Sequence, residues 1–171
     1  MLNRLARMGG SAWYWLAVLA TGLSLDAVAL YYQYALDYYP CVLCIHVRIW
    51  VLGFVLVAAV ALLVRGSRLL LVLSHVLTVA LSIGLLERAW MLLGIERGTV
   101  EGSCSFDSGL PAWFALDQWF PLLFKVWEAC GYTPELLFGV TMAEALVALG
   151  MVALLITAVM TVASLAGKPG Q

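Results

Sequence analysis

The chain has 171 residues, of which 64% are hydrophobic and 11% charged, and its mean hydropathy is +1.01. This composition excludes a soluble globular domain, and a net charge of −1 without a basic stripe or nucleic-acid motif gives no reason to expect nucleic acid as a partner. Several apolar stretches reach the ~18 to 20 residues that a helix needs to cross a bilayer. The sequence therefore predicts a single integral membrane domain over residues 1–171.

Four membrane spans are predicted in chain order, at about residues 13–33, 42–64, 69–93 and 138–163. They predict an all-α fold, a four-helix membrane bundle with one long loop at about residues 94–137. Arg4 and Arg7 precede the first span as in a signal peptide, but the apolar run is longer than a usual h-region and no small-residue cleavage site is evident. We therefore expect an uncleaved first helix.

The distribution of charge predicts the orientation of the bundle. The short segments at 1–12, 65–68 and 164–171 contain basic but no acidic residues: Arg4, Arg7, Arg65, Arg68 and Lys168. Such segments face the cytoplasm. In the long loop, acidic residues outnumber basic ones. We therefore expect both termini to be cytoplasmic and the four cysteines, Cys41, Cys44, Cys104 and Cys130, to lie at or beyond the outer surface.

An aromatic segment of the long loop follows Pro111, with the sequence AWFALDQWFPLLFKVWEACG. It is rich in Trp and Phe but interrupted by Asp117, Pro121 and Lys125, and it is too short and too polar to span a bilayer. Trp favours the headgroup region. The segment predicts one or two short interfacial helices that hold the loop close to the membrane.

The sequence PCVLC, which begins at Pro40, is a redox candidate because a Cys-x-x-Cys pair exchanges readily between dithiol and disulfide. Pro40 favours a turn into a helix, which places Cys44 in the first turn, where the helix dipole stabilises an anionic sulfur. Arg48 follows four residues later on the same face and adds a permanent positive charge. We expect Cys44 to be the activated thiolate and Cys41 the exchanging partner.

Two arginines are predicted inside the membrane. Arg48 lies about 6 to 10 Å below the outer surface on helical rise, and Arg88, preceded by Glu87, lies at a similar depth in the third span. Ionisable residues in spans are functional candidates, and both arginines would suit a polar group of a lipid-soluble molecule. The alternative is that either side chain snorkels to the interface. Asp26, in the first span, either neutralises an arginine or lines a wet cavity.

Cys104 and Cys130 form a second candidate pair, because a disulfide on an exposed loop can be reached by another protein. Four cysteines on the oxidising side of a membrane favour disulfide chemistry, although three pairings are possible. A structural zinc site would need a second Cys-x-x-Cys or histidine ligands in a suitable pattern, so no metal is expected. Two inert disulfide staples are the other alternative, but a Cys-x-x-Cys ring constrains little chain.

The combination of PCVLC, Arg48, the loop cysteines and the sequence LDQWFP, which begins at Leu116, resembles the disulfide bond formation protein B (DsbB) family over essentially the whole chain. The resemblance implies a quinone-dependent thiol oxidase of the bacterial inner membrane, with ubiquinone or menaquinone as cofactor. It also implies a periplasmic DsbA-like dithiol oxidoreductase as partner.

The resemblance further implies a role for each cysteine. In that family the partner attacks Cys104 of a Cys104–Cys130 disulfide. The pair Cys41 and Cys44 then reoxidises Cys104 and Cys130, and Cys44 passes the electrons to a quinone beside Arg48. The chain departs from the family in two places. Val47 stands where a glutamate is common, and the region of Arg88 lacks a histidine that some members have near the outer end of the third span. Arg88 is therefore the second candidate for quinone binding.

Two other function classes fit a membrane-edge Cys-x-x-Cys. A vitamin K epoxide reductase-like protein or another transmembrane thiol reductase would use the same motif with a different electron direction or acceptor. A non-catalytic membrane protein stapled by disulfides would not need Arg48. Cysteine spacing alone does not give the direction of electron flow.

Overall fold

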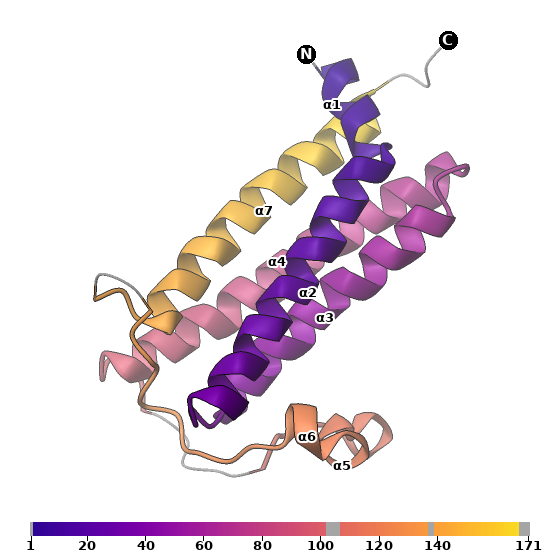
Figure 1. Ribbon diagram of the computed structural model, residues 1–171. Coiled ribbons are helices and arrows are strands. Elements are labelled where there is room, and N and C mark those ends of the chain that lie inside the picture. Colours follow the sequence, from indigo (N-terminus) through magenta and orange to yellow (C-terminus); the bar gives the residue numbers. More distant parts are fainter. Residues whose placement is uncertain (1, 102–106, 137–138, 168–171) are drawn as a thin grey trace.

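The structure is a computed structural model that describes residues 2–101, 107–136 and 139–167, and these are predominantly helical (Figure 1). Its helical elements are α1 (Leu2–Gly9), α2 (Ala12–Ala35), α3 (Val42–Leu63), α4 (Arg68–Glu96), the 3-10 turn η1 (Ala112–Phe114), α5 (Leu116–Trp119), α6 (Pro121–Phe124) and α7 (Met142–Ala166). The described residues contain no strand, only an isolated bridge between Glu135 and Thr141. The predicted all-α class is confirmed.

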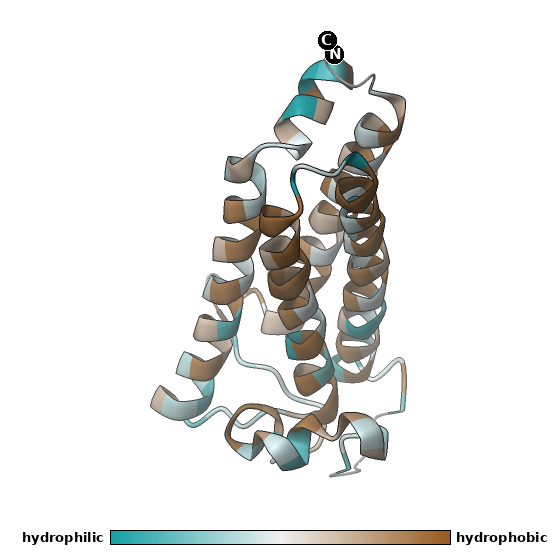
Figure 2. Ribbon diagram, turned by 90° about the vertical axis from the view of Figure 1, so that its right-hand side faces the viewer, coloured by the Kyte–Doolittle hydropathy of each residue, from teal (hydrophilic) through white to brown (hydrophobic). Residues whose placement is uncertain are grey.

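Four long helices form the bundle, and each is long and apolar enough to cross a membrane: α2, α3, α4 and α7. α3 packs against α2 and α4, and α4 packs along α7. α1 lies at the end of the bundle where both chain termini are found, whereas α5 and α6 lie across the opposite end (Figure 1). Hydrophobic residues make up much of the long helices (Figure 2). Many of their large apolar side chains are exposed, as expected for faces that contact lipid.

Local sequence explains where the helices begin. Ser11 caps α2 by accepting a hydrogen bond from the Tyr14 amide at 3.3 Å, which separates α2 from the short helix α1. Thr141 and Glu144 form a reciprocal capping box, so α7 begins at Met142 rather than at the predicted residue 138. Pro121 starts α6 and separates it from α5, because proline lacks the amide hydrogen that a continuing helix needs.

Small residues and hydroxyl groups hold the long helices together. A Cβ on Gly84 of α4 would lie 2.6 Å from the Trp50 ring of α3, and one on Gly150 of α7 would lie 3.2 Å from the Leu86 backbone of α4. Ser82 and Thr157 join α4 to α7 through a buried hydrogen bond of 3.0 Å. Close approach at small residues and hydrogen bonds between helices are the usual means of association inside a bilayer, where the hydrophobic effect gives little.

Candidate active site

Three of the four cysteines meet at the start of α3. Cys41 is the N-cap of α3, its sulfur accepts a hydrogen bond from the Cys44 amide at 3.4 Å, and the Cys41 and Cys44 sulfurs lie 2.8 Å apart. The Cys130 thiol hydrogen-bonds with Cys41 and with the backbone of Val42 and Leu43. The three cysteines are free thiols here. The sulfurs therefore gather around amide groups that an α-helix leaves unpaired at its positive end.

Hydrogen bonding and burial shift the pKa values of two cysteines outside the long helices, Cys41 and Cys130. The hydrogen bond with Cys41, followed by burial, raises the pKa of the Cys130 thiol well above its ordinary value. For Cys41, the hydrogen bond with Cys130 lowers the pKa, but the contact with Cys44 and burial outweigh it and raise the pKa to about 12. In this arrangement both groups are protonated thiols at neutral pH.

Cys104 lies outside the described residues. Its predicted pairing with Cys130, and its predicted role as the sulfur attacked by a partner, therefore stay predictions. The described part of the loop brings Cys130 to Cys41 across a long stretch of sequence.

Arg48 lies one helical turn beyond Cys44 and is buried, with 6% of its surface exposed. Its Nη1 group donates hydrogen bonds to the Gln33 side-chain oxygen, at 3.0 Å, and to the Leu123 carbonyl. The Arg48 Nε group is buried and has no hydrogen-bond partner among the described residues. Arg48 therefore ties α3 to α2 and α6.

The sequence analysis missed Gln33, which is 4% exposed near the end of α2. Its amide nitrogen donates to the Leu122 carbonyl at 3.4 Å, and the neighbouring Tyr34 hydroxyl donates to the same carbonyl. The signal that could have identified Gln33 is a side-chain amide near the end of an apolar span, because a buried polar side chain in a membrane helix needs a partner.

A cavity of about 270 Å³ opens beside Cys44 and Arg48. Its walls come from α2, α3, α7 and the loop, and its polar lining includes Asp26 and Glu128. A cavity wall is one of the two roles predicted for Asp26. Most of the lining is apolar, so the cavity fits a largely apolar molecule with a few polar groups.

Arg88 is not among the residues that line this cavity. Its Nε group forms an ion pair of 2.9 Å with the adjacent Glu87, and both side chains are partly exposed. The structure thus does not bring Arg88 to Cys44, and its proposed contact with quinone stays a prediction. Among the described residues, no group of three or more His, Cys, Asp or Glu residues could hold a metal ion.

Comparison with known proteins gives a consistent picture. A family model for disulfide bond formation protein DsbB matches residues 11–160. Disulfide bond formation protein B 2 of Pseudomonas aeruginosa is 36% identical over 147 residues, which cover 85% of this chain and 87% of that protein. Disulfide bond formation protein B of Shewanella loihica is 31% identical over 144 residues, with 84% of each chain covered. The corresponding protein of Haemophilus influenzae is 29% identical over 148 residues, covering 86% of this chain and 84% of that protein.

Proposed function

The chain belongs to the DsbB family of disulfide bond formation proteins, and from this premise we propose that it is a membrane thiol oxidase that reoxidises a periplasmic DsbA-like dithiol oxidoreductase and passes the electrons to a membrane quinone. In this proposal the protein lies in the bacterial inner membrane, with cytoplasmic termini and periplasmic cysteines. The observation that carries it is the contact of Cys130 with Cys41, while Cys44 lines a cavity beside Arg48.

The first steps are thiol–disulfide exchanges. A thiolate of the partner attacks Cys104 of a Cys104–Cys130 disulfide and releases the Cys130 sulfur, and the second partner thiolate then releases Cys104 and leaves the partner oxidised. The Cys130 thiolate attacks Cys41 of a Cys41–Cys44 disulfide, which frees Cys44. Cys104 then attacks Cys130, so that Cys104–Cys130 is restored and Cys41 becomes a thiol. The contact between Cys130 and Cys41 supports the central exchange.

The remaining two electrons leave from the Cys41–Cys44 pair. A bound quinone supplies a two-electron, two-proton acceptor that is soluble in lipid. The first turn of α3 and the Arg48 guanidinium stabilise negative charge on the Cys44 sulfur. Closure of the Cys41–Cys44 disulfide, whose sulfurs already lie in contact at 2.8 Å, completes the cycle. Each turnover thus converts two partner thiols to one disulfide and one quinone to quinol.

A second cavity supports a lipid-soluble acceptor. It has a volume of about 430 Å³, lies between α2, α3, α4 and α7, and shares Leu25, Val51 and Leu149 with the first cavity. Its lining is predominantly apolar. A quinone ring in the first cavity could therefore extend its polyprenyl tail into the second.

The experiment that tests this function is anaerobic turnover of the purified protein with a reduced DsbA-type partner and added quinone. Loss of partner thiols and quinone absorbance are followed together, with Cys44→Ser as the variant. We expect two thiols to be lost per quinone reduced, and no quinone reduction by the variant. Quinol-driven reduction of the oxidised partner without the forward reaction would favour a thiol reductase. No coupled reaction in either direction would favour a stapled, non-catalytic protein.

A further inference from the structure

The segment that carries Cys130, residues 127–134, is fastened on both sides of the cysteine. Before Cys130, the Trp127 amide donates a hydrogen bond to the Pro40 carbonyl at 3.0 Å. After Cys130, the Thr133 hydroxyl donates to the Glu96 carboxylate at 2.7 Å. The Cys130 segment is thus held against both the start of α3 and the end of α4.

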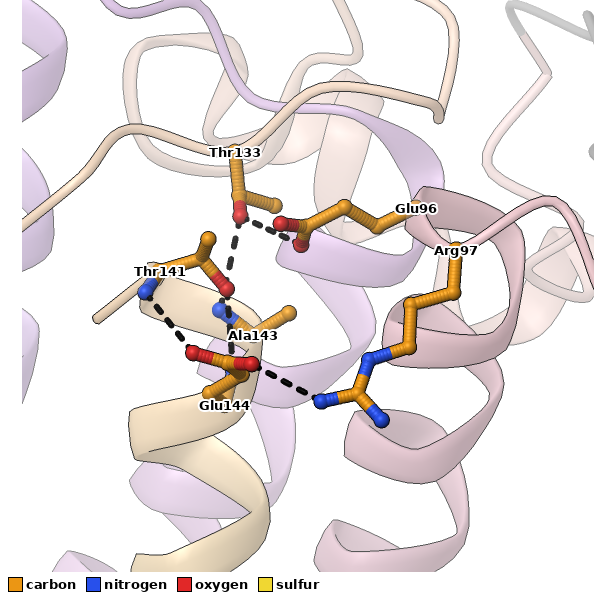
Figure 3. Close-up of polar contacts among 6 residues, drawn as sticks. All are labelled: Glu96, Arg97, Thr133, Thr141, Ala143 and Glu144. Carbon is orange, nitrogen blue, oxygen red and sulfur yellow. Dashed lines mark hydrogen bonds and ion pairs between the residues drawn. The ribbon is translucent and has the colours of Figure 1, made fainter. Parts of the chain in front are cut away.

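Thr133 joins three parts of the chain through one buried hydroxyl (Figure 3). Its oxygen donates to Glu96, the last residue of α4, and accepts from the Ala143 amide in the first turn of α7 at 3.4 Å. The residue is 3% exposed. A hydrogen bond from a buried hydroxyl to a charged carboxylate is among the stronger ones in proteins. Thr133 therefore fixes the Cys130 segment more firmly than its apolar packing alone would.

The chemistry at Cys130 depends on where its sulfur lies. In the exchange that transfers the disulfide inward, the Cys130 thiolate forms a bond to the Cys41 sulfur and the Cys41–Cys44 bond breaks, releasing Cys44 as a thiolate without a net change in oxidation state. Such an exchange gains from a high effective concentration of the attacking sulfur. The hydrogen bonds before and after Cys130 limit the movement of its segment relative to the start of α3.

We propose that Thr133 and Glu96 are positioning residues that hold the Cys130 thiol on Cys41 and thereby favour the Cys41–Cys130 disulfide. This inference rests on the proposed function, since it assigns a role in the exchange between the loop and the bundle. Glu96 is also the residue from which the chain departs α4 toward Cys104 in the sequence. The Thr133–Glu96 contact therefore joins the end of α4, where the long loop begins, to the segment that carries Cys130.

The test measures the effective concentration of Cys130 at Cys41 directly. In a Cys44→Ser, Cys104→Ser background, Cys41 and Cys130 are the remaining cysteines. The protein is equilibrated with reduced and oxidised glutathione, and the fraction of Cys41–Cys130 disulfide is read from thiol trapping. Thr133→Val, which keeps the side-chain shape but removes the hydroxyl, should lower the effective concentration about tenfold. Thr133→Ser should stay within about twofold of the parent.

Thr141→Val is the matched control. Thr141 caps α7 within the same cluster but bonds Glu144 rather than the Cys130 segment (Figure 3). Loss of its cap should make the protein easier to unfold without changing the effective concentration. A general loss of stability would instead affect the Thr133→Val and Thr141→Val proteins alike.

The proposal fails if Thr133→Val keeps the parental effective concentration, or if Thr133→Ser falls as far as Thr133→Val. Should Thr133→Val not fold, Glu96→Ala removes the same contact from a partly exposed position and decides the matter by the same criterion. The assay contains neither quinone nor a partner protein. Its outcome is therefore separate from that of the turnover experiment that tests the oxidase function.

Discussion

At the scale of single residues, Arg48 serves two contacts. Its Nη1 group donates hydrogen bonds to the Leu123 carbonyl of the loop and to Gln33 of α2. The residue also lines the cavity that Cys44 lines. A guanidinium in a membrane helix is costly, and one at the edge of a mostly apolar cavity suits an acceptor atom of a bound molecule. This pattern favours Arg48 as the residue that binds an acceptor oxygen.

We predict that Arg48→Met raises the apparent Michaelis constant for quinone by about 10- to 100-fold, the effect of losing a hydrogen bond to a charged group. Membrane insertion should be unchanged, because methionine is at least as favourable in a span. Turnover at varied quinone concentration, with membrane extraction of the variant as the control, measures the effect. An unchanged constant would remove Arg48 from the site.

Cys130 gives a prediction about pH. Because its pKa is raised, chiefly by the hydrogen bond with Cys41 and then by burial, little thiolate exists at pH 8, and the alkylation rate should rise with pH instead of levelling off near the ordinary thiol pKa of about 8.5. The measurement is the iodoacetamide rate at Cys130, by mass spectrometry, in the fully reduced protein between pH 7 and pH 10.

Cys41→Ala is the informative variant, because it removes the largest cause of the shift. Its Cys130 should react faster at pH 8 and level off at a lower pH than the parental cysteine. Detergent-denatured protein provides the reference for an ordinary thiol. A parental rate that levels off together with this reference would contradict the prediction.

The sequence predicts local relations between these residues but not the distant ones. Helix geometry alone places Cys44 in the first turn of α3, with Arg48 one turn further on. The contact of Cys130 with Cys41 depends on the path of a long loop, for which no periodicity exists. The direction of the Arg88 side chain depends on the rotation of α4 about its axis. Leu85 and Ala89 face the core, so Arg88 points in another direction.

At the scale of helices, Gly150 lies at a close approach between α4 and α7. A Cβ there would lie 3.2 Å from the Leu86 Cα, and a backbone atom cannot move aside as a side chain can. We predict that Gly150→Val lowers the free energy of unfolding by about 1 to 3 kcal/mol through overpacking. Unfolding in mixed detergent micelles measures it.

Gly66→Val is the control for this substitution. Gly66 lies between α3 and α4, and a Cβ there meets nothing within 4 Å. This variant should unfold with a free energy close to that of the parent. Equal effects at Gly66 and Gly150 would show that valine destabilises these glycine sites irrespective of helix packing.

The predicted spans compare well with the long helices in number and order, because a run of about 20 apolar residues is a strong signal. Shorter elements were harder to predict. The amphipathic α1 was not expected as a separate helix, since its eight residues carry no long periodic pattern. The aromatic part of the loop forms short turns, split at Pro121 as its sequence indicated.

At the scale of the whole molecule, charge and architecture agree on two distinct ends. Both termini lie at one end of the bundle (Figures 1 and 2). That end also carries the turn between α3 and α4, with Arg65 and Arg68, and Arg68 donates to the Gly167 carbonyl at 2.7 Å. The opposite end carries the described part of the loop and Cys41, Cys44 and Cys130. The positive-inside rule then predicts that the basic end is cytoplasmic.

This orientation decides whether the proposed electron path can work, because the partner and its oxidising compartment must be on the side of Cys130. We predict that a Gly66→Cys probe, in a protein without its native cysteines, reacts with a membrane-impermeant maleimide only after spheroplasts are permeabilised. A Gln118→Cys probe, which lies in α5 on an exposed residue, should react in intact spheroplasts. The opposite pattern would place the thiols in the reducing cytoplasm, where a thiol reductase rather than an oxidase would be the expected activity.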